Sequence, residues 1–277
     1  MRRVDLSQAL EIASQTDTGM VRPHNEDSIA SSPDKGLVVL ADGMGGYNAG
    51  EVASGMATTV LTTELRQLIE DHAPSVIDPQ SGLKAALIML QQQIAKANAA
   101  IYQASRSQPQ YAGMGTTLVL ALFYDNKVMV AHIGDSRLYR MRGEEFSQVT
   151  KDHSLLQEQI DAGMLTKEQA KRSSNKNLVT RALGIDPAVE AEIHEYDTRP
   201  GDIYLLCSDG LSDMVVDEDI GMTLRALGAN LNLAAQQLVQ MANDNGGRDN
   251  ISVILIRILR EYPAGQGLAS KIFGWFR

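Results

Sequence analysis

Short apolar runs bounded by Gly, Pro, Asn and Asp recur along the chain, and each run is long enough for one β-strand. Four longer segments instead place apolar residues at helical spacing, which predicts amphipathic helices. The predicted strands cover 9–15, 36–41, 117–124, 127–133, 137–142, 191–197, 203–207 and 251–259. The predicted helices cover 49–70, 83–105, 217–227 and 231–243.

The order of these elements predicts an α+β fold. Strands are joined by short turns and helices are grouped in blocks, which favours antiparallel sheets over parallel βαβ winding. The dipeptide Asp125-Asn126 between two strands predicts a hairpin turn. We expect one domain over 1–260, interrupted at 151–183 by a polar, mostly helical excursion, and a separate tail over 261–277. The only Trp and two Phe lie in this tail, which either packs on the body or docks on a partner or a membrane surface.

Composition narrows the function classes. The hydrophobic content of 44% supports a large core, and a net charge of −9 with a pI near 5.1 argues against nucleic-acid binding, which needs a basic face. The single cysteine, Cys207, lies in an apolar run, so we expect a buried thiol in a reducing compartment. No segment resembles a signal peptide or a membrane span, so we expect a cytoplasmic protein.

Four aspartates stand beside tight turns at the ends of predicted strands: Asp42-Gly43, Gly134-Asp135, Asp209-Gly210 and Asp249-Asn250. Strand ends from distant parts of a sequence can converge on one pocket, where four carboxylates would repel one another unless a cation held them. Oxygen ligands select hard cations, Mg²⁺ or Mn²⁺ above all. No cysteine cluster or histidine pair has zinc spacing, and the five histidines are scattered. The pattern predicts a metal enzyme.

Arg22 adds a group suited to phosphate, because a guanidinium can donate two parallel hydrogen bonds to phosphate oxygens and keeps its charge. It lies four residues before Glu26, in a loop that contains a proline. Once Glu26 and Asp27 are counted as further carboxylates of the site, a phosphate ester becomes the predicted substrate. A solvated surface arginine is the alternative.

Six motifs carry a family resemblance that covers about 9–258. They are Arg22-Pro-His-Asn-Glu-Asp27, Ala41-Asp-Gly-Met-Gly-Gly46, Gly115-Thr-Thr117, Gly134-Asp-Ser-Arg137, Cys207-Ser-Asp-Gly-Leu211 and Gly247-Arg-Asp-Asn-Ile-Ser252. Together they resemble the motif set of the metal-dependent Ser/Thr protein phosphatases, the protein phosphatase 2C (PPM) family, in its bacterial branch. The resemblance implies a four-layer α-β-β-α sandwich of two antiparallel sheets flanked by helices, with metals in a cleft at one edge.

The resemblance also implies roles for the carboxylates. Asp42 would bridge two ions, Mn²⁺ or Mg²⁺. Asp209 and Asp249 would complete the coordination of the first ion. Glu26 and the carbonyl of Gly43 would coordinate the second, partly through water. Of these, Asp42 and Asp209 are counted as catalytic, together with Arg22.

Other positions follow from the same motifs. Asp135 would help to hold a third, weaker ion, and Arg22 would bind the phosphate. Asp27 and Asn250 would orient metal ligands from behind. Thr117 would lie in a strand beside the cleft, where a purely structural role is equally open.

Met44 differs from the residue that many family members carry at this place, and the excursion at 151–183 resembles a segment of the bacterial members. Many eukaryotic members carry a histidine at the place of Met44, proposed as the acid that protonates the leaving group, whereas methionine holds no proton to give. Water or a nearby histidine such as His153 would then serve, or none does. The excursion at 151–183 resembles the mobile flap of bacterial members, and its basic residues either steer substrates or form a solvated face: Lys167, Lys171, Arg172 and Lys176.

The resemblance implies a Ser/Thr phosphoprotein phosphatase, in which water activated at a binuclear site attacks the phosphomonoester directly. Expected partners are phosphorylated Ser/Thr proteins and a cognate bacterial Ser/Thr kinase, with no nucleic acid, and the expected state is a monomer. The alternative is a catalytically weak pseudo-phosphatase that binds phosphoproteins. An aspartate-nucleophile phosphatase is disfavoured because the only Asp-x-Asp starts a polar helix at Asp217, and no P-loop supports a kinase or NTPase.

Overall fold

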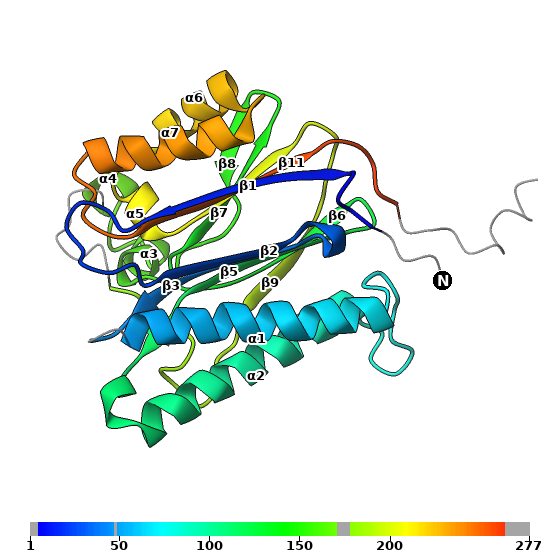
Figure 1. Cartoon of the computed structure of the whole chain (residues 1–277), viewed down its shortest axis with the longest axis horizontal. Helices are drawn as coiled ribbons and strands as arrows, with labels where there is room; N and C mark the ends of the chain where they lie inside the picture. Colours follow the sequence, from blue (N-terminus) through cyan, green and yellow to red (C-terminus); the bar gives the residue numbers. More distant parts are fainter. Residues whose placement is uncertain (1–4, 47–48, 171–177, 264–277) are drawn as a thin grey trace, which may run out of the picture.

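The computed structural model describes residues 5–46, 49–170 and 178–263, and there the chain forms two β-sheets packed face to face (Figure 1). The first sheet has the order β1-β11-β10-β7-β8, and the second β2-β3-β5-β6-β9, with β4 paired to β3. Neighbouring strands run antiparallel throughout. The strands are β1 Leu10–Asp17, β2 Asp27–Ser32, β3 Leu37–Met44, β4 Gly115–Thr116, β5 Leu118–Tyr124, β6 Lys127–Ile133, β7 Arg137–Arg142, β8 Glu145–Gln148, β9 Glu192–Asp197, β10 Ile203–Cys207 and β11 Ile251–Ile258.

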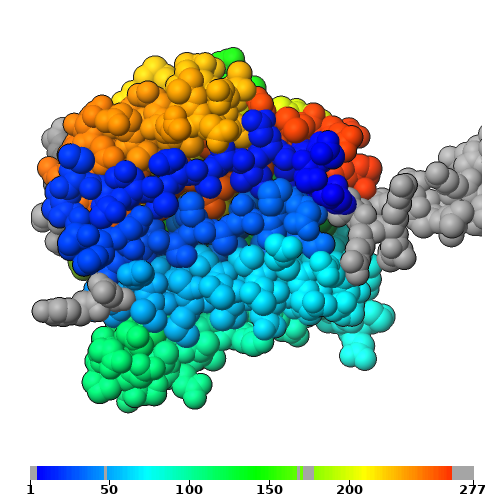
Figure 2. Space-filling model, in the orientation of Figure 1, coloured from blue at the N-terminus to red at the C-terminus, as the bar shows by residue number. Residues whose placement is uncertain are grey.

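Helices cover the outer face of each sheet, with α1 and α2 on the second sheet and α6 and α7 on the first (Figure 1). From the side, the edge strands β1 and β2 lie between the orange α7 and the cyan α1 (Figure 2). The α-helices are α1 Ala49–Asp71, α2 Ala85–Ser107, α3 Leu155–Asp161, α4 Lys167–Ala170, α5 Asp209–Ser212, α6 Asp217–Leu227 and α7 Leu231–Asp244, and 3₁₀ turns occupy Pro33–Lys35 and Pro109–Tyr111. None of the helices in the described ranges combines the length and the apolar character that a membrane crossing requires.

Three hydrophobic clusters hold these four layers together. One lies between the sheets, one under α1 and α2, and one under α6 and α7. Strand β3 is buried on both faces, because Val38 and Leu40 join the cluster between the sheets while Leu37 and Val39 face α1 and α2. A strand covered on both faces reads as a continuous apolar run, which is why the sequence predicts it readily. The four-layer α-β-β-α architecture is confirmed.

Several local predictions are also confirmed. Asp125 and Asn126 both have positive φ, 48° and 56°, as the two central residues of a type I′ hairpin turn require, and they join β5 to β6. Cys207 is fully buried, and burial raises the pKa of its thiol to about 12. The thiol therefore stays protonated at neutral pH.

Two predictions about the periphery need correction or refinement. In its described parts, 151–170 and 178–183, the excursion at 151–183 is less helical than expected, because α3 spans 7 residues and α4 spans 4, and Gly163 (φ +68°) follows the end of α3. Three of its basic residues, Lys171, Arg172 and Lys176, lie outside the described residues. In the predicted tail, Tyr262 is buried between the sheets, and its hydroxyl lies 2.6 Å from the Thr198 hydroxyl. The rest of the tail, 264–277, lies outside the described residues.

Candidate metal centre

The predicted carboxylates come together at one end of the sandwich, where strand ends of both sheets meet. In the second sheet, Asp42 on β3 is paired directly with Asp27 on β2, so the two side chains lie on the same face. In the first sheet, Asp209 follows the end of β10 and Asp249 precedes the start of the neighbouring β11. Asp135 follows the end of β6 in the second sheet. Strands from distant parts of the sequence thus bring these groups to one place.

Hydrogen bonds join the two sheets at this point. The Ser208 hydroxyl, just after β10, donates to Oδ2 of Asp27 at 2.8 Å. The side-chain oxygen of Asn250 accepts from the backbone N–H of Glu26 at 2.8 Å, and its amide nitrogen donates to the carbonyls of Thr18 and His24, both at 2.9 Å. The amide of Asn250 therefore fixes the loop that carries Arg22 and Glu26.

The threonine pair before β5 fixes the backbone of Asp42. The backbone N–H of Asp42 donates to Oγ1 of Thr117 at 3.0 Å. The carbonyl of Asp42 accepts from the Thr117 N–H at 2.9 Å and from Oγ1 of Thr116 at 2.8 Å. Thr117 is fully buried, at 1% exposure. It therefore orients Asp42 through the backbone.

The electrostatics of this group of carboxylates are those of crowded like charges. Burial raises the pKa of Asp42 and of Asp209 well above the usual range, and the nearest other carboxylates raise both further. Burial also raises the pKa of Asp27 and of Asp135 to about 6. Proton binding is thus favoured at several of these groups when no cation is present, because a buried carboxylate beside others ionises reluctantly.

Two carboxylate oxygens in this group lack a partner within the described part of the protein. Oδ1 of Asp209 and Oδ1 of Asp27 are buried and accept no hydrogen bond. A buried carboxylate oxygen without a partner is costly, and a divalent cation removes that cost together with the mutual repulsion. The donors are carboxylate oxygens, which suit Mn²⁺ and Mg²⁺. The residues present therefore fit the predicted metal chemistry.

Arg22 stands beside the carboxylates at the solvent side. Its Nη2 lies 2.6 Å from Oδ2 of Asp249, and about half of its side chain is exposed. The hydrogen bond to Asp249 raises the pKa of the guanidinium further, so it is always charged. The structure therefore combines an exposed, permanently charged guanidinium with a buried carboxylate group.

Glu26 lies in a tight space formed by two glycines. The N–H of Gly43 donates to the carbonyl of Glu26 at 3.1 Å. A Cβ on Gly43 would stand 2.2 Å from the carbonyl oxygen of Gly50, and a Cβ on Gly50 would stand 2.8 Å from Cδ of Glu26. The start of α1 can approach Glu26 and β3 this closely only because both positions are glycine.

This contact gives a prediction with a matched control in the same helix. In Gly50→Ala the new methyl group must displace Glu26 or the Gly43 backbone, so we expect metal affinity to fall at least about tenfold, as it does when groups supporting a metal site are disturbed. In Gly55→Ala the methyl group meets nothing within 4 Å, and we expect unchanged affinity with stability higher by about 0.5–1 kcal/mol. Titration calorimetry with Mn²⁺ and thermal unfolding measure both. Equal affinity in the two variants would contradict the role of the glycine contact.

Sequence reasoning missed two kinds of residue here. Ser208 and Ser136 lie inside recognised motifs, but a serine after an apolar run carries no signal of its own. Two of the five histidines described as scattered are in fact neighbours, because His132, His153 and Glu192 bring ring nitrogens and a carboxylate oxygen within 4.8 Å of one another. Sequence reasoning missed this group because β6 and β9 are adjacent in space though distant in sequence.

His153 is 7% exposed and both its ring nitrogens have partners, which argues against its serving as proton donor to a leaving group.

Comparisons with known proteins agree with this geometry. A model of the family described as protein phosphatase 2C matches residues 21–255. Over 266 residues the chain is 38% identical to serine/threonine protein phosphatase PstP of Mycobacterium tuberculosis, covering 96% of this chain but 48% of that protein, so it spans about half of that relative. Over 245 residues it is 36% identical to serine/threonine phosphatase stp of Listeria monocytogenes, covering 87% of this chain and 93% of that protein.

A solved structure gives the same picture in three dimensions. The catalytic domain of PstP, in complex with two manganese ions, matches with a TM-score of 0.77 at 37% identity, covering 91% of this chain and 99% of that chain. The family model alone accounts for well over half of the sequence, and it includes every carboxylate of the centre, from Glu26 to Asp249. The chain belongs to the protein phosphatase 2C family.

Proposed function

We propose that the chain is a Ser/Thr phosphoprotein phosphatase that hydrolyses phosphomonoesters by direct attack of water at a two-cation centre. The observation that carries the proposal is the charged guanidinium of Arg22 beside a buried carboxylate group with unpartnered oxygens. Membership of the protein phosphatase 2C family and the names of the bacterial relatives support it.

We assign the carboxylates as follows. Asp42 would be shared by two cations, Asp209 and Asp249 would complete the coordination of the first, and Glu26 with the carbonyl of Gly43 would hold the second. The central position of Asp42 supports its role, because carboxylates from both sheets raise its pKa. When bound, the cations supply a nucleophile from water and neutralise the charge that develops on the phosphoryl group.

The remaining residues bind and orient. Arg22 donates hydrogen bonds to the phosphate oxygens, and its exposed half leaves room for a protein substrate. Asp27, held by the Ser208 hydroxyl, and Asn250, which carries the Arg22–Glu26 loop, keep the ligands in place. Thr117 fixes Asp42 through its backbone. Met44 holds no proton, so we assign no side chain as the acid for the leaving group.

The identity of the ions and of the partners is a finer proposal. The two manganese ions of the PstP structure support Mn²⁺ in both positions, with Mg²⁺ as the competing ion and Asp135 at a third, weaker position. Phosphorylated Ser/Thr proteins are the expected substrates. A cognate bacterial kinase, a cytoplasmic location and a monomeric state stay predictions.

The pseudo-phosphatase alternative is disfavoured by the same residues. All the predicted metal carboxylates are present, and the described structure brings them to one place with Arg22. A protein that only binds phosphoproteins needs the guanidinium but not this costly gathering of buried like charges.

Hydrolysis of an aryl phosphate tests the proposal most directly. We expect turnover with Mn²⁺ or Mg²⁺, loss of turnover in EDTA, and recovery when the cation is restored, because no side chain here replaces the cation as a source of nucleophile. Phosphoserine and phosphothreonine peptides should be hydrolysed as well. Full activity after stringent metal removal would overturn the mechanism, and metal binding without any turnover would favour the pseudo-phosphatase.

A further inference from the structure

His153 makes two hydrogen bonds with Gly134, the residue directly before Asp135. Its backbone N–H donates to the carbonyl of Gly134 at 2.9 Å. The N–H of Gly134 in turn donates to the ring nitrogen Nδ1 of His153 at 3.2 Å. Both polar groups of the Gly134 backbone are therefore engaged by one histidine.

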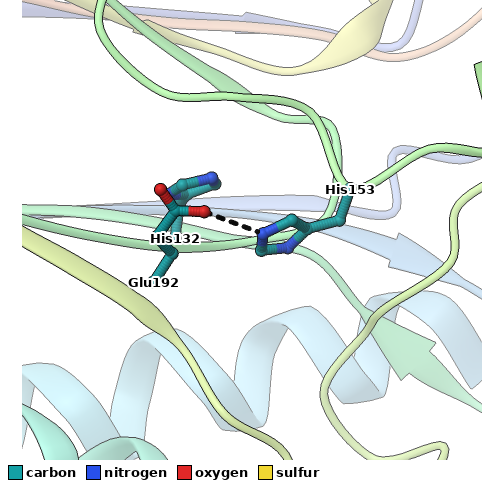
Figure 3. A group of neighbouring side chains, drawn as sticks. All are labelled: His132, His153 and Glu192. Atoms are coloured by element: carbon teal, nitrogen blue, oxygen red, sulfur yellow. Dashed lines mark hydrogen bonds and ion pairs between the residues drawn. The ribbon is translucent and has the colours of Figure 1, made fainter. Parts of the chain in front are cut away.

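This contact defines the protonation of the ring. A backbone N–H can only donate, so Nδ1 of His153 must carry a lone pair and the proton of the neutral ring must sit on Nε2. That nitrogen faces Oε2 of Glu192 at 3.4 Å, as the dashed line in Figure 3 shows. Burial lowers the pKa of His153, and the neighbouring His132 lowers it further, which keeps the ring neutral at pH 7.

The neighbours of His153 hold the ring in this position. His132 stacks on it with ring centroids 4.7 Å apart, and Nε2 of His132 donates to the carbonyl of Lys151 at 2.8 Å. Glu192 lies opposite His132 in the pairing of β6 with β9, and its other oxygen lies 2.9 Å from Nε2 of His194. The backbone carbonyl of His153 accepts from the Thr180 N–H at 2.8 Å, so His153 also joins the two ends of the 151–183 excursion.

The Gly134 backbone has little freedom on its other side. It has φ +100°, and a Cβ there would stand 2.7 Å from the methyl carbon of Thr117. The residue after Asp135, Ser136, shares a 2.7 Å hydrogen bond with the Thr117 hydroxyl, which also holds Asp42. The residue on the N-terminal side of Asp135 is therefore held by His153, and the residue on its C-terminal side is held by Thr117.

The same three side chains could instead suggest a transition-metal site, since two imidazoles and a carboxylate can bind zinc. Two features oppose that reading. The Gly134 N–H places the proton on the nitrogen that faces Glu192, leaving no lone pair there for a metal. The two rings are also nearly parallel, at 19°, so their in-plane lone pairs do not converge on one point.

We propose that His153 is a positioning residue that fixes the Gly134 backbone through its unprotonated Nδ1 and thereby sets the affinity of the Asp135 cation position. The part that concerns the cation rests on the proposed function. The part that concerns the hydrogen bond does not, because it can be measured on metal-free protein without substrate. Asp135 is the carboxylate assigned to the weakest cation position, and it directly follows Gly134, so a shift of the Gly134 backbone changes that position first.

The first test is a ¹⁵N NMR measurement of the histidine tautomers in the metal-free protein at pH 7. We expect His153 as the neutral ring protonated at Nε2, with the Gly134 amide protected from hydrogen exchange. Addition of Zn²⁺ in the presence of saturating Mg²⁺ should leave the His153 nitrogen signals unchanged. A ring protonated at Nδ1, or a zinc-bound nitrogen at His153, would overturn the proposal.

The second test uses a matched pair of substitutions. His153→Asn places an amide oxygen near the position of Nδ1, whereas His153→Gln places its polar atoms near Nε2. We expect the His153→Asn variant to retain the protection of the Gly134 amide and the weakest Mn²⁺ affinity within about twofold. We expect the His153→Gln variant to lower both by about fivefold to tenfold, as the loss of one hydrogen bond implies. Asp135→Asn identifies which Mn²⁺ step belongs to Asp135. Equal behaviour of the two variants would mean that His153 only fills space.

Discussion

We expect replacement of Asp42 by asparagine to abolish phosphatase turnover and at the same time to raise the melting temperature of the metal-free protein. The activity falls more than about a hundredfold, because disturbing groups behind metal ligands already costs 10–100-fold and Asp42 is assigned to two cations. The stability rises because Asp42, buried among Asp27, Asp209 and Asp135, must either hold a charge there or take up a proton on folding, and an asparagine of the same shape avoids both costs. At this chain length each 1 kcal/mol shifts the melting temperature by roughly 2–4 °C.

The two effects are measured by steady-state hydrolysis in Mn²⁺ and by calorimetry in EDTA. Asp186→Asn is the control, because its side chain is exposed outside the centre and neither quantity should move. With saturating Mn²⁺ the order of stability should reverse, since the wild type then gains from binding and the variant gains less. A metal-free Asp42→Asn protein that melts below the wild type would contradict the like-charge account.

We expect the stability of the metal-free protein to fall as the pH rises from 5 to 7. The pKa of Asp27 and of Asp135 is raised to about 6, and those of Asp42 and Asp209 are raised further, so these groups bind protons more tightly in the folded than in the unfolded chain. Such groups stabilise the fold fully below their unfolded pKa near 4 and lose that contribution as the pH passes their folded pKa. We expect a net loss in the free energy of unfolding, on the order of the 1.4 kcal/mol that one unit of pKa difference contributes for each group.

Cation binding should remove this pH dependence. A cation competes with protons for the same oxygens, so saturating Mn²⁺ should flatten the fall or turn it into a rise between pH 5 and 7. Carboxylates with lowered pKa, such as Glu195, act in the opposite direction but titrate mainly below this window. The lowered pKa of His132 and of His153 acts in the opposite direction within it and offsets part of the fall. Urea unfolding at pH 5, 6 and 7, with EDTA and with Mn²⁺, measures the effect. A pH-independent free energy in EDTA would contradict it.

The fold was predictable from sequence where burial is complete on one or both faces. Strands such as β3 and β10 read as unbroken apolar runs, and α1 shows a regular apolar stripe, so these elements were expected within one to three residues of their ends. The carboxylates were predictable for a related reason. They lie at the ends of such strands beside turn residues, and the metal chemistry follows from the residue type alone.

Two edge strands were missed because their residues lack that pattern. Strand β2, Asp27–Ser32, is mostly small and polar, and it is held by pairing with β3 and by contacts such as the 2.7 Å hydrogen bond between the Ser28 and Thr58 hydroxyls. Strand β8, Glu145–Gln148, has one large apolar residue, Phe146, which stacks on Tyr139. In both, tertiary pairing decides the structure and local preference does not.

The histidine group was missed for a topological reason. His132 and Glu192 are 60 positions apart and meet only because β9 pairs with β6, which no local spacing reveals. The role of Thr117 was left open because a threonine in a strand is common, and only the contacts to Asp42 distinguish it.

The carboxylate group lies at one end of the contact between the two sheets, which pack on each other through the hydrophobic cluster between them. Each sheet has its own pair of helices and its own hydrophobic cluster, and Asp209 and Asp249 come from one while Asp27, Asp42 and Asp135 come from the other. Bound cations would therefore act as a crosslink between two half-proteins, and their removal would set like charges against each other across the seam. In a metal-starved cell the enzyme would not merely be idle. It would open more often at that seam and be cleared sooner by proteases, so its abundance would follow the supply of its own cofactor.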